Sequence, residues 1–187
     1  MSAQSMLVTY ANLANTFPVY LNKASKTTDP VERLKLVMTA NFSYFFYAQR
    51  FEKPLNPILG ETFQAYAQDG TKIFMEQTAH HPPRTHLIIE GPDNNYYFHG
   101  YLEFAIYAGL QNASMTCAGF KEITFPDGGK IRWDQNGDYF SGIFMGTMGH
   151  QMTGTITFTD EANNLTGTYQ YGAYNFRKQD FCWGEIK

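Results

Sequence analysis

The spacing of apolar residues divides the chain into a short N-terminal segment, one helix and a long stretch with the period of β-strands. Residues 1–28 carry no sustained period. Asp29 is a favourable N-cap, Pro30 suits the first helical position, and Glu32 can complete a capping box. Apolar residues then follow at intervals of three and four, at Val31, Leu34, Val37, Met38, Phe42 and Phe45. This spacing predicts a helix over 29–48, the one long helix that we expect.

From Lys53 onward the apolar residues follow the period of strands, and Gly, Asn and Asp interrupt them at short intervals. Asp69-Gly70, for example, is typical of a hairpin turn. We predict strands at residues 63–67, 71–76, 86–90, 96–107, 114–117, 122–125, 130–133, 139–145, 151–158, 166–171 and 180–186. The fold class is therefore mainly β, with a single domain over 1–187. In it, residues 53–187 form an antiparallel sheet that makes a partial or short β-barrel, preceded by the N-terminal helix.

The composition fits an aromatic-rich β protein and argues against two classes of function. Aromatic residues make up 17% of the 187 residues, charged residues also 17%, and the formal net charge is -3. Nucleic-acid binding needs a clustered basic excess, which the scattered Lys and Arg do not provide. No run approaches the roughly 20 apolar residues of a membrane span, and the N-terminus lacks a signal-peptide pattern. We therefore expect a cytoplasmic protein, with Cys117 and Cys182 as reduced thiols that bind no metal.

The segment EQTAHHPP, residues 76–83, carries the most distinctive chemistry. Pro82 and Pro83 cannot donate backbone hydrogen bonds, so a strand ladder must stop there. His81 precedes a proline, which pushes it towards extended geometry. His80 and His81 are thus held on a stiff corner, where two imidazoles suit an anionic head group better than a packed core.

A second rigid run, KPLNPILGETF, spans residues 53–63. A proline on either side of Asn56 makes this run a turn rather than a helix or a central strand. Lys53 supplies a cation at its start, and the Asn56 amide offers both a hydrogen-bond donor and an acceptor. Together with His80 and His81, these two residues are the candidate lipid head-group ligands.

Both runs resemble the oxysterol-binding protein and oxysterol-binding-protein-related family of lipid-transfer proteins. The family pattern is Glu, then Lys or Gln, any residue, Ser or Cys, His, His or Arg, and Pro-Pro; residues 76–83 match it except at Ala79. His86 also departs, because the family usually has a small residue there. The run over 53–63 is similar to the other hallmark of the family. The resemblance is good over residues 30–104 and weak beyond them.

The resemblance implies a non-catalytic lipid-binding barrel that shuttles lipid between membranes. Family members hold one sterol, phosphatidylserine or phosphatidylinositol 4-phosphate in an interior tunnel. By this resemblance, Lys53 contacts the head group and Asn56 binds a phospholipid head group. His80 and His81 contact the phosphate of a phosphoinositide. The implied partners are the lipid ligand and a transient membrane surface, with no nucleic acid, cofactor or metal.

The lipid-binding domain of the family is about twice as long as this chain. In the family, further strands and a helical region that help to hold the head group follow the part that matches. A half-built barrel leaves an exposed sheet edge, which is prone to association. We therefore expect either a homodimer that completes the open edge or a sheet that closes differently. Which lipid is carried, which membranes are served, and whether the chain is a natural short form or a fragment stay open.

Two other functions stay open on the residues alone. A small β-barrel hydrolase could use the His80/His81 pair, although no Ser or Cys stands in a nucleophile elbow and no third metal ligand is evident. Adjacent strand residues point to opposite faces, so neighbouring histidines seldom share one metal. His86, His99 and His150 also lack ligand spacing with them. The other alternative is an adaptor whose barrel no longer binds lipid.

Overall fold

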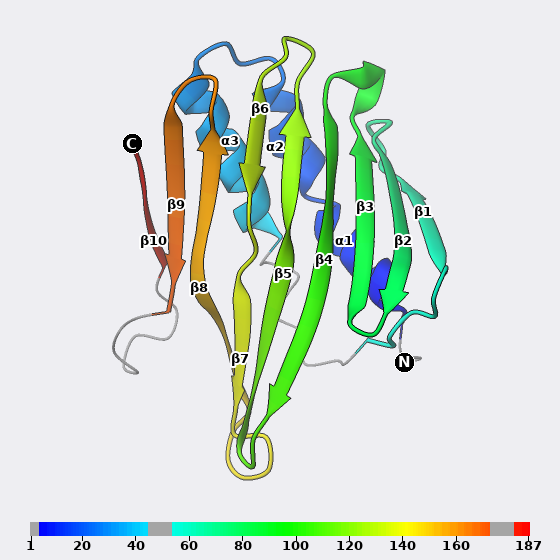
Figure 1. The fold of residues 1–187 in the computed structure, drawn as a ribbon. Coiled ribbons are helices and arrows are strands. Elements are labelled where there is room, and N and C mark those ends of the chain that lie inside the picture. Colours follow the sequence, from blue (N-terminus) through cyan, green and yellow to red (C-terminus); the bar gives the residue numbers. More distant parts are fainter. Residues whose placement is uncertain (1–3, 45–53, 173–181) are drawn as a thin grey trace.

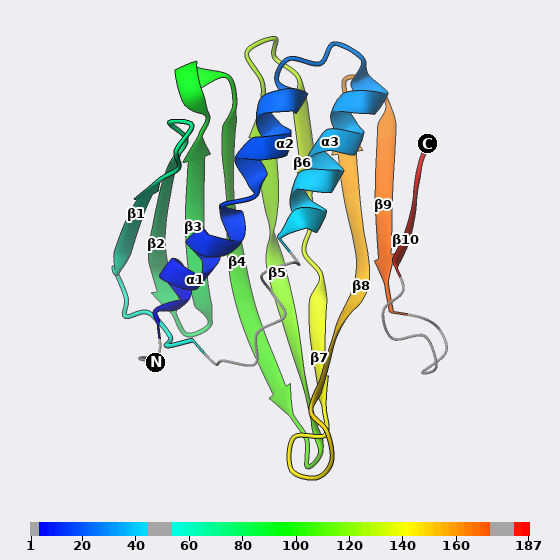
Figure 2. The same ribbon diagram turned by 180° about the vertical axis from the view of Figure 1, so that it is seen from behind.

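The computed structural model describes residues 4–44, 54–172 and 182–187. They form a ten-stranded antiparallel sheet with three helices packed on one of its faces (Figures 1 and 2). We call the face that the helices cover the inner face and the opposite one the outer face. This architecture confirms the prediction of a mainly β protein whose antiparallel sheet forms part of a ring.

The strands follow the order β1-β2-β3-β4-β5-β6-β8-β9-β10, and β7 pairs beside this path with β5 and β8. Neighbours in the chain pair as hairpins because the Gly, Asn and Asp residues between them suit tight turns. β1 and β10 lie at opposite edges of the sheet, so the described part of the chain forms an open ring (Figure 1). The bounds are β1 Thr62–Tyr66, β2 Lys72–His80, β3 Pro83–Glu90, β4 Tyr97–Ala108, β5 Asn112–Thr124, β6 Lys130–Trp133, β7 Gly137–Ser141, β8 Gly149–Asp160, β9 Leu165–Tyr171 and β10 Cys182–Ile186.

In the described part of the chain, three helices precede the sheet, whereas the sequence predicts one long helix. The two additional helices, α1 (Met6–Ala14) and α2 (Phe17–Ala24), lie in the segment for which the sequence shows no sustained period. Helices shorter than about 12–15 residues are marginal on their own, so their formation depends on packing. Leu7, Phe17 and Leu21 supply that packing and are buried. Among the described residues, no helix is long and apolar enough to cross a bilayer.

The predicted long helix is present as α3 (Pro30–Ser43). The Asp29 side chain accepts hydrogen bonds from Val31 N at 2.8 Å and from Glu32 N at 3.1 Å. These bonds confirm the predicted N-cap, because they satisfy two backbone donors that have no partner within the first turn. Residues 45–48 of the predicted helix lie outside the described residues.

Two strands differ from their predicted extents. β5 is continuous, although the sequence predicts two strands separated near Gly119. Gly119 has a φ of 118° inside the strand, and a Cβ there would meet Tyr101 O at 2.1 Å. The glycine therefore permits close backbone packing and does not form a turn. β7 ends at Ser141, and residues 142–148 form a loop instead of continuing the strand to Met145.

The hydrophobic core lies between the helices and the inner face. Phe98 of β4 is fully buried, with its ring centroid 5.9 Å from that of Phe17 on α2 and 5.5 Å from that of Trp133 on β6. Trp133 in turn stacks on Phe158 of β8 at 5.3 Å. Alternate strand residues enter this layer, as the period of two requires. They include Ile73, Met75, Leu87, Ile89, Leu102, Ile123, Ile131 and Ile156.

One lysine is buried within this core. Lys121 of β5 is 2% exposed; its ammonium donates a hydrogen bond to Asn41 Oδ1 at 3.2 Å and lies 5.2 Å from the ring centroid of Tyr44. Asn41 Oδ1 also accepts a hydrogen bond from Trp133 Nε1 at 2.9 Å. Burial lowers the pKa of Lys121 to about 8, because desolvation disfavours the charged form. Burial also raises the pKa of the nearby Cys117 thiol to about 12.

Candidate functional site

The two histidines lie together at the corner where β2 turns into β3. β2 ends at His80 and β3 begins at Pro83, as expected from the two prolines. The peptide bond between His81 and Pro82 is cis. The two imidazole rings meet edge to face, with their centroids 4.7 Å apart. The corner therefore presents both imidazoles at one point of the sheet.

A β-bulge decides which face of the sheet His80 occupies. Between two successive strand pairs, β2 advances by two residues, from Gln77 to Ala79, whereas β3 advances by one. Thr78 is therefore an extra residue on β2, as in a β-bulge. The alternation of faces shifts by one at this point, which places His80 on the inner face together with Gln77. The Nδ1 atom of His80 is buried and has no hydrogen-bond partner among the described residues. Because buried polar atoms are nearly always paired, this atom is a candidate ligand contact.

The loop before β1 is fastened to β2 by backbone hydrogen bonds. Gly60 N donates to Gln77 O, and Gln77 N donates to Glu61 O, both at 2.9 Å. The Glu61 carboxylate accepts hydrogen bonds from Ile58 N at 3.1 Å and from Ser5 Oγ at 2.5 Å. Since Ser5 is also the N-cap of α1, the loop is held between the first helix and the second strand.

Asn56, one of the candidate residues, contacts Gln77 near the end of β2. Asn56 is exposed, and its Oδ1 accepts a long hydrogen bond of 3.5 Å from Gln77 Nε2. Gln77 is 1% exposed, and its Oε1 accepts a hydrogen bond of 2.6 Å from Thr85 Oγ1. The structure thus brings Asn56 and His80 to the same end of β2 as Gln77. Lys53, the predicted cation, lies outside the described residues.

Gln77 joins the two motif segments, although the sequence motifs alone predict no role for it. It follows Ile73 and Met75 in the alternating series of inner-face residues on β2. A polar residue in an apolar series is costly unless its amide is hydrogen-bonded, so it marks a polar network or a ligand contact. That break in the pattern is the signal from which the sequence could have identified Gln77.

Arg84 and His86 lie on the outer face and are engaged there. Arg84 donates to Glu103 Oε2 from Nε at 2.7 Å and from a terminal nitrogen at 2.5 Å. His86 Nδ1 lies 2.7 Å from Thr78 Oγ1. The pKa of His86 is lowered by its partial burial and by the charge of Arg84. These groups satisfy one another, which leaves the inner side of the corner as the candidate site.

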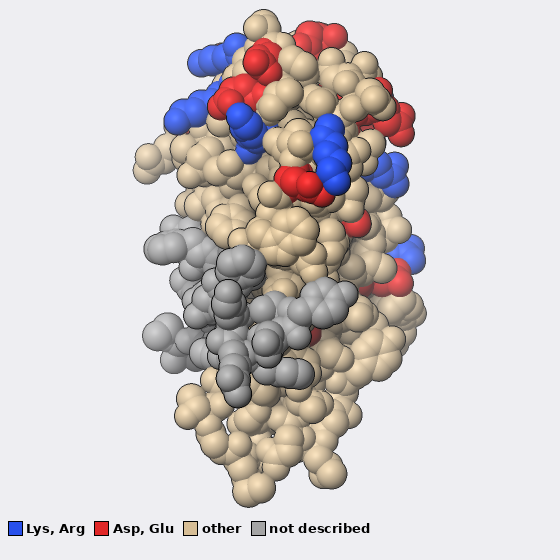
Figure 3. Space-filling view, turned by 90° about the vertical axis from the view of Figure 1, so that its left-hand side faces the viewer, with Lys and Arg blue, Asp and Glu red and all other residues tan. Residues whose placement is uncertain are grey.

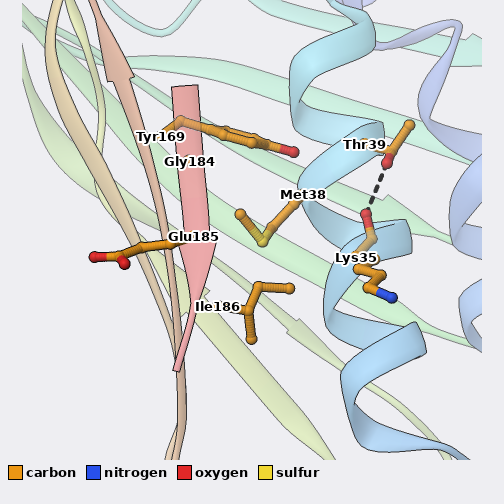
Figure 4. A pocket seen from close by; sticks show the side chains of 7 residues that line it. All are labelled: Lys35, Met38, Thr39, Tyr169, Gly184, Glu185 and Ile186. Carbon is orange, nitrogen blue, oxygen red and sulfur yellow. Dashed lines mark hydrogen bonds between the residues drawn. The ribbon is translucent and has the colours of Figure 1, made fainter. Parts of the chain in front are cut away.

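A separate pocket of about 450 Å³ lies between α3 and β10 (Figure 4). Met38 and Ile186 point into this space, whereas Glu185 points away from it. The pocket borders the β10 edge, and the His80–His81 corner lies near the β1 edge, so the two are distinct (Figure 1). Its lining residues are Lys35, Met38, Thr39, Tyr169, Gly184, Glu185 and Ile186.

Within the described ranges, no group of three or more His, Cys, Asp or Glu side chains could hold a metal ion.

Together, the fold and the corner define a class of binding protein. It is built on an antiparallel β-sheet that helices cover on one face, and two proline-stiffened segments meet at one end of that sheet. The family model described as "Oxysterol-binding protein" matches residues 1–185. The chain therefore belongs to the oxysterol-binding protein family, whose members are non-catalytic lipid-transfer proteins. This membership confirms the resemblance seen in the two motif runs and the prediction that the chain is not an enzyme.

Curated relatives are considerably longer than this chain. Oxysterol-binding protein 9 of Dictyostelium discoideum is 37% identical over 150 residues, which cover 79% of this chain and 35% of that protein. Oxysterol-binding protein-related protein 1 of Homo sapiens is 42% identical over 84 residues, which cover 43% of this chain and 9% of that protein. The matched region is thus about a third or less of each relative.

Solved structures share the fold. The Osh1 ORD domain in complex with cholesterol has a TM-score of 0.87 at 23% identity, over 98% of this chain and 44% of that one. The Osh3 ORD in complex with PI(4)P from Saccharomyces cerevisiae has a TM-score of 0.80 at 17% identity, over 92% of this chain and 46% of that one. The chain therefore has the fold of somewhat less than half of these structures.

Proposed function

We propose that this chain binds a lipid without catalysis and takes part in moving it between membranes. We assign recognition of a phosphoinositide head group, with phosphatidylinositol 4-phosphate as the first candidate, to the end of β2 where the two motif segments meet. A sterol is the second candidate ligand. One related domain was solved with PI(4)P and another with cholesterol. The observation that carries the proposal is the buried Nδ1 of His80, which has no partner among the described residues, beside the ring of His81.

The chemistry of the corner suits a phosphate. A phosphomonoester carries about -1.5 to -2 charges near neutral pH and has three acceptor oxygens. The imidazoles of His80 and His81 can donate hydrogen bonds to these oxygens. The Oδ1 of Asn56 accepts a hydrogen bond from Gln77, so we assign to its amide N–H groups the role of donors to the ligand. We assign to Lys53 the role of the compact positive charge.

The proposed function implies a localisation and a set of binding partners. We infer that the protein acts in the cytoplasm and touches membranes peripherally and transiently. The lipid ligand and the membrane surface are its partners, and the binding cycle needs no cofactor. The reaction is an exchange of hydrogen bonds and buried apolar surface, with no covalent step.

Replacing both corner histidines by alanine tests the proposal. H80A/H81A should weaken binding to vesicles that contain phosphatidylinositol 4-phosphate by at least about tenfold, because each charge-assisted hydrogen bond contributes about 1.5–3 kcal/mol. Binding to matched vesicles of phosphatidylcholine alone should not change. Vesicle co-sedimentation measures both affinities, and circular dichroism checks that the variant is folded.

H99A is the control, since it also removes an imidazole but from the outer face of β4. This variant should keep its preference for the phosphoinositide. A preference that survives H80A/H81A contradicts the assigned roles, and so does an equal loss in H99A. Mass spectrometry of co-purified lipids identifies the natural ligand. Stoichiometric zinc found by elemental analysis would instead favour the hydrolase alternative.

The open edges of the sheet motivate a prediction about assembly. β1 and β10 are edge strands, and Tyr66 and Trp183 on them are 69% and 48% exposed. Unpaired strand edges bind other strands, so we expect the purified chain to form a homodimer in which a second copy completes the wall. Light scattering coupled to size-exclusion chromatography measures the mass. A monodisperse monomer at micromolar concentration would rule out this arrangement.

A further inference from the structure

A cluster of exposed apolar side chains occupies the tip of the sheet, where β4, β5, β7 and β8 extend past the helices (Figures 1 and 2). The tip consists of the β4–β5 turn and the loop between β7 and β8. Leu110 is 88% exposed, and Phe144 and Met145 are each 74% exposed. We call this cluster the apolar tip; its residues are Ile106, Tyr107, Leu110, Ile143, Phe144, Met145 and Met148. So many large apolar side chains in water at one point are unusual for a protein without a partner there.

The apolar tip carries no acidic or basic side chain. No Lys, Arg, Asp or Glu occurs between Glu103 and Lys121, nor between Asp138 and Asp160. Figure 3 shows the same division: charged residues lie over the upper part of this face, and the lower end is uncharged. The imidazole of His150, at the start of β8, hydrogen-bonds to Asp138 at 2.8 Å. Within the described part of the chain, the seven side chains of the tip thus offer no charge to a charged partner.

The two loops of the apolar tip are held together in a defined shape. Ile143 N donates to Gln111 O at 3.3 Å and joins the two loops, and Gly109 N donates to Asn112 O at 2.8 Å to close the β4–β5 turn. Gly142 has a φ of 68°, and a Cβ there would meet Thr147 O at 2.4 Å, so the loop turns tightly. A preformed tip loses little conformational entropy when its side chains become buried.

We propose that the apolar tip docks the protein on a lipid bilayer by inserting its side chains at the boundary of head groups and acyl chains. An uncharged, aromatic and aliphatic surface suits that layer. A stable protein interface takes about 20–30 residues on each side, whereas the tip offers seven large apolar residues. This inference rests on the proposed lipid transport, which requires membrane contact. It also fits the position of the His80–His81 corner, which lies at the same end of the sheet (Figure 1).

The test uses vesicles of phosphatidylcholine alone, so that no phosphoinositide contributes to binding. The wild-type chain should partition onto these vesicles, and L110D/F144D should partition at least about tenfold more weakly, because it places two carboxylates where apolar groups would be buried. V19D/Y97D is the matched control: it adds the same charge at positions that are 57% and 42% exposed, on α2 and at the start of β4, away from the tip. This control should bind like the wild type.

Two further measurements separate apolar insertion from attraction by charge and from self-association. F144W should show a larger blue shift of tryptophan fluorescence on addition of vesicles than the wild type, whose own tryptophans are Trp133 and Trp183. The difference reports on transfer of position 144 into an apolar layer. Wild-type adsorption should change little between about 0.1 and 1 M salt, because screening weakens charge attraction but not apolar insertion. The proposal is overturned if L110D/F144D binds like the wild type, if V19D/Y97D loses as much, or if F144W shows no shift beyond that of the wild type. A wild-type dimer that L110D/F144D converts to monomer would overturn it in favour of self-association.

Two experiments distinguish a failure of docking by the apolar tip from a failure of the proposed head-group binding. H80A/H81A should adsorb to phosphatidylcholine vesicles like the wild type, because the apolar tip is intact. L110D/F144D should still bind a soluble, short-chain phosphatidylinositol 4-phosphate, because the corner is intact. If the tip variant instead loses the soluble lipid as well, the tip supports the binding site and is not a separate docking surface.

Discussion

Phe98→Ala should lower the free energy of unfolding by about 3–5 kcal/mol. The side chain is fully buried between α2 and the sheet, and its ring contacts the rings of Phe17 and Trp133. Truncation removes buried apolar surface and leaves a cavity between layers that cannot close around it. Chemical denaturation monitored by circular dichroism measures the change.

The neighbouring residue on the same strand provides the control. Tyr97 is 42% exposed on the outer face, so Tyr97→Ala should cost no more than about 1 kcal/mol. If the two variants are equally destabilised, the helices do not pack on the face that carries Phe98. A large cost at Phe98 alone supports the assignment of inner and outer faces on which the candidate site depends.

Lys121→Met should increase stability at pH 7 by about 1–3 kcal/mol. In the wild type, the fold buries an ammonium that donates a hydrogen bond to a neutral acceptor, Asn41 Oδ1. Methionine fills a similar volume without a charge, and Asn41 Oδ1 keeps its hydrogen bond from Trp133 Nε1. Lys72→Met is the control, because that side chain is 50% exposed and pairs with Glu90 on the outer face. It should change stability by less than about 1 kcal/mol.

The pH dependence of stability distinguishes this mechanism from better packing. The pKa of Lys121 is about 8 in the fold against an ordinary value of 10.5. Above pH 8 the unfolded chain therefore keeps a proton that the folded chain has released, and stability rises by up to about 1.4 kcal/mol per pH unit. From about pH 9 the Cys117 thiol acts in the opposite direction, because its pKa is raised from 9.0 to about 12. The net increase in stability should therefore occur between pH 8 and 9.

Lys121→Met should lack this rise, whereas Lys72→Met should keep it. Urea unfolding at pH 7, 8 and 9 measures the three curves. A rise that persists in Lys121→Met would mean that another group titrates in this range. Lower stability of Lys121→Met at pH 7 would mean that the fold solvates the ammonium better than its contacts indicate.

The sequence predicts those parts of the fold that local chemistry dictates. Asp29 and Pro30 define the start of α3, and the two prolines of the HHPP segment define the end of β2. By contrast, α1 and α2 depend on burial of residues such as Leu7 and Phe17 against the sheet, a contact that no local pattern encodes. Gly119 is ambiguous for the same reason: a glycine serves a turn or a close packing contact equally well, and only the neighbouring strand decides between them.

The candidate site, too, is predicted in part by local sequence and depends for the rest on contacts between strands. Both motif runs are visible in the sequence, and the backbone hydrogen bonds of Gly60 and Glu61 explain why they act together. The face occupied by His80 cannot be deduced from alternation, because the extra residue at Thr78 reverses it. Gln77, the residue that connects the two runs, is visible only as a polar break in an apolar series.

The bulge at Thr78 also constrains how this hairpin can change. Deleting Thr78, the variable position of the family pattern, would leave the four letters HHPP in place but shorten the pattern, and it would turn the first imidazole from the lining of the sheet to its outside. Two chains can thus both carry HHPP and differ in whether its first histidine can reach a lipid. Comparisons of such chains should therefore align the length of the preceding strand as well as the signature itself.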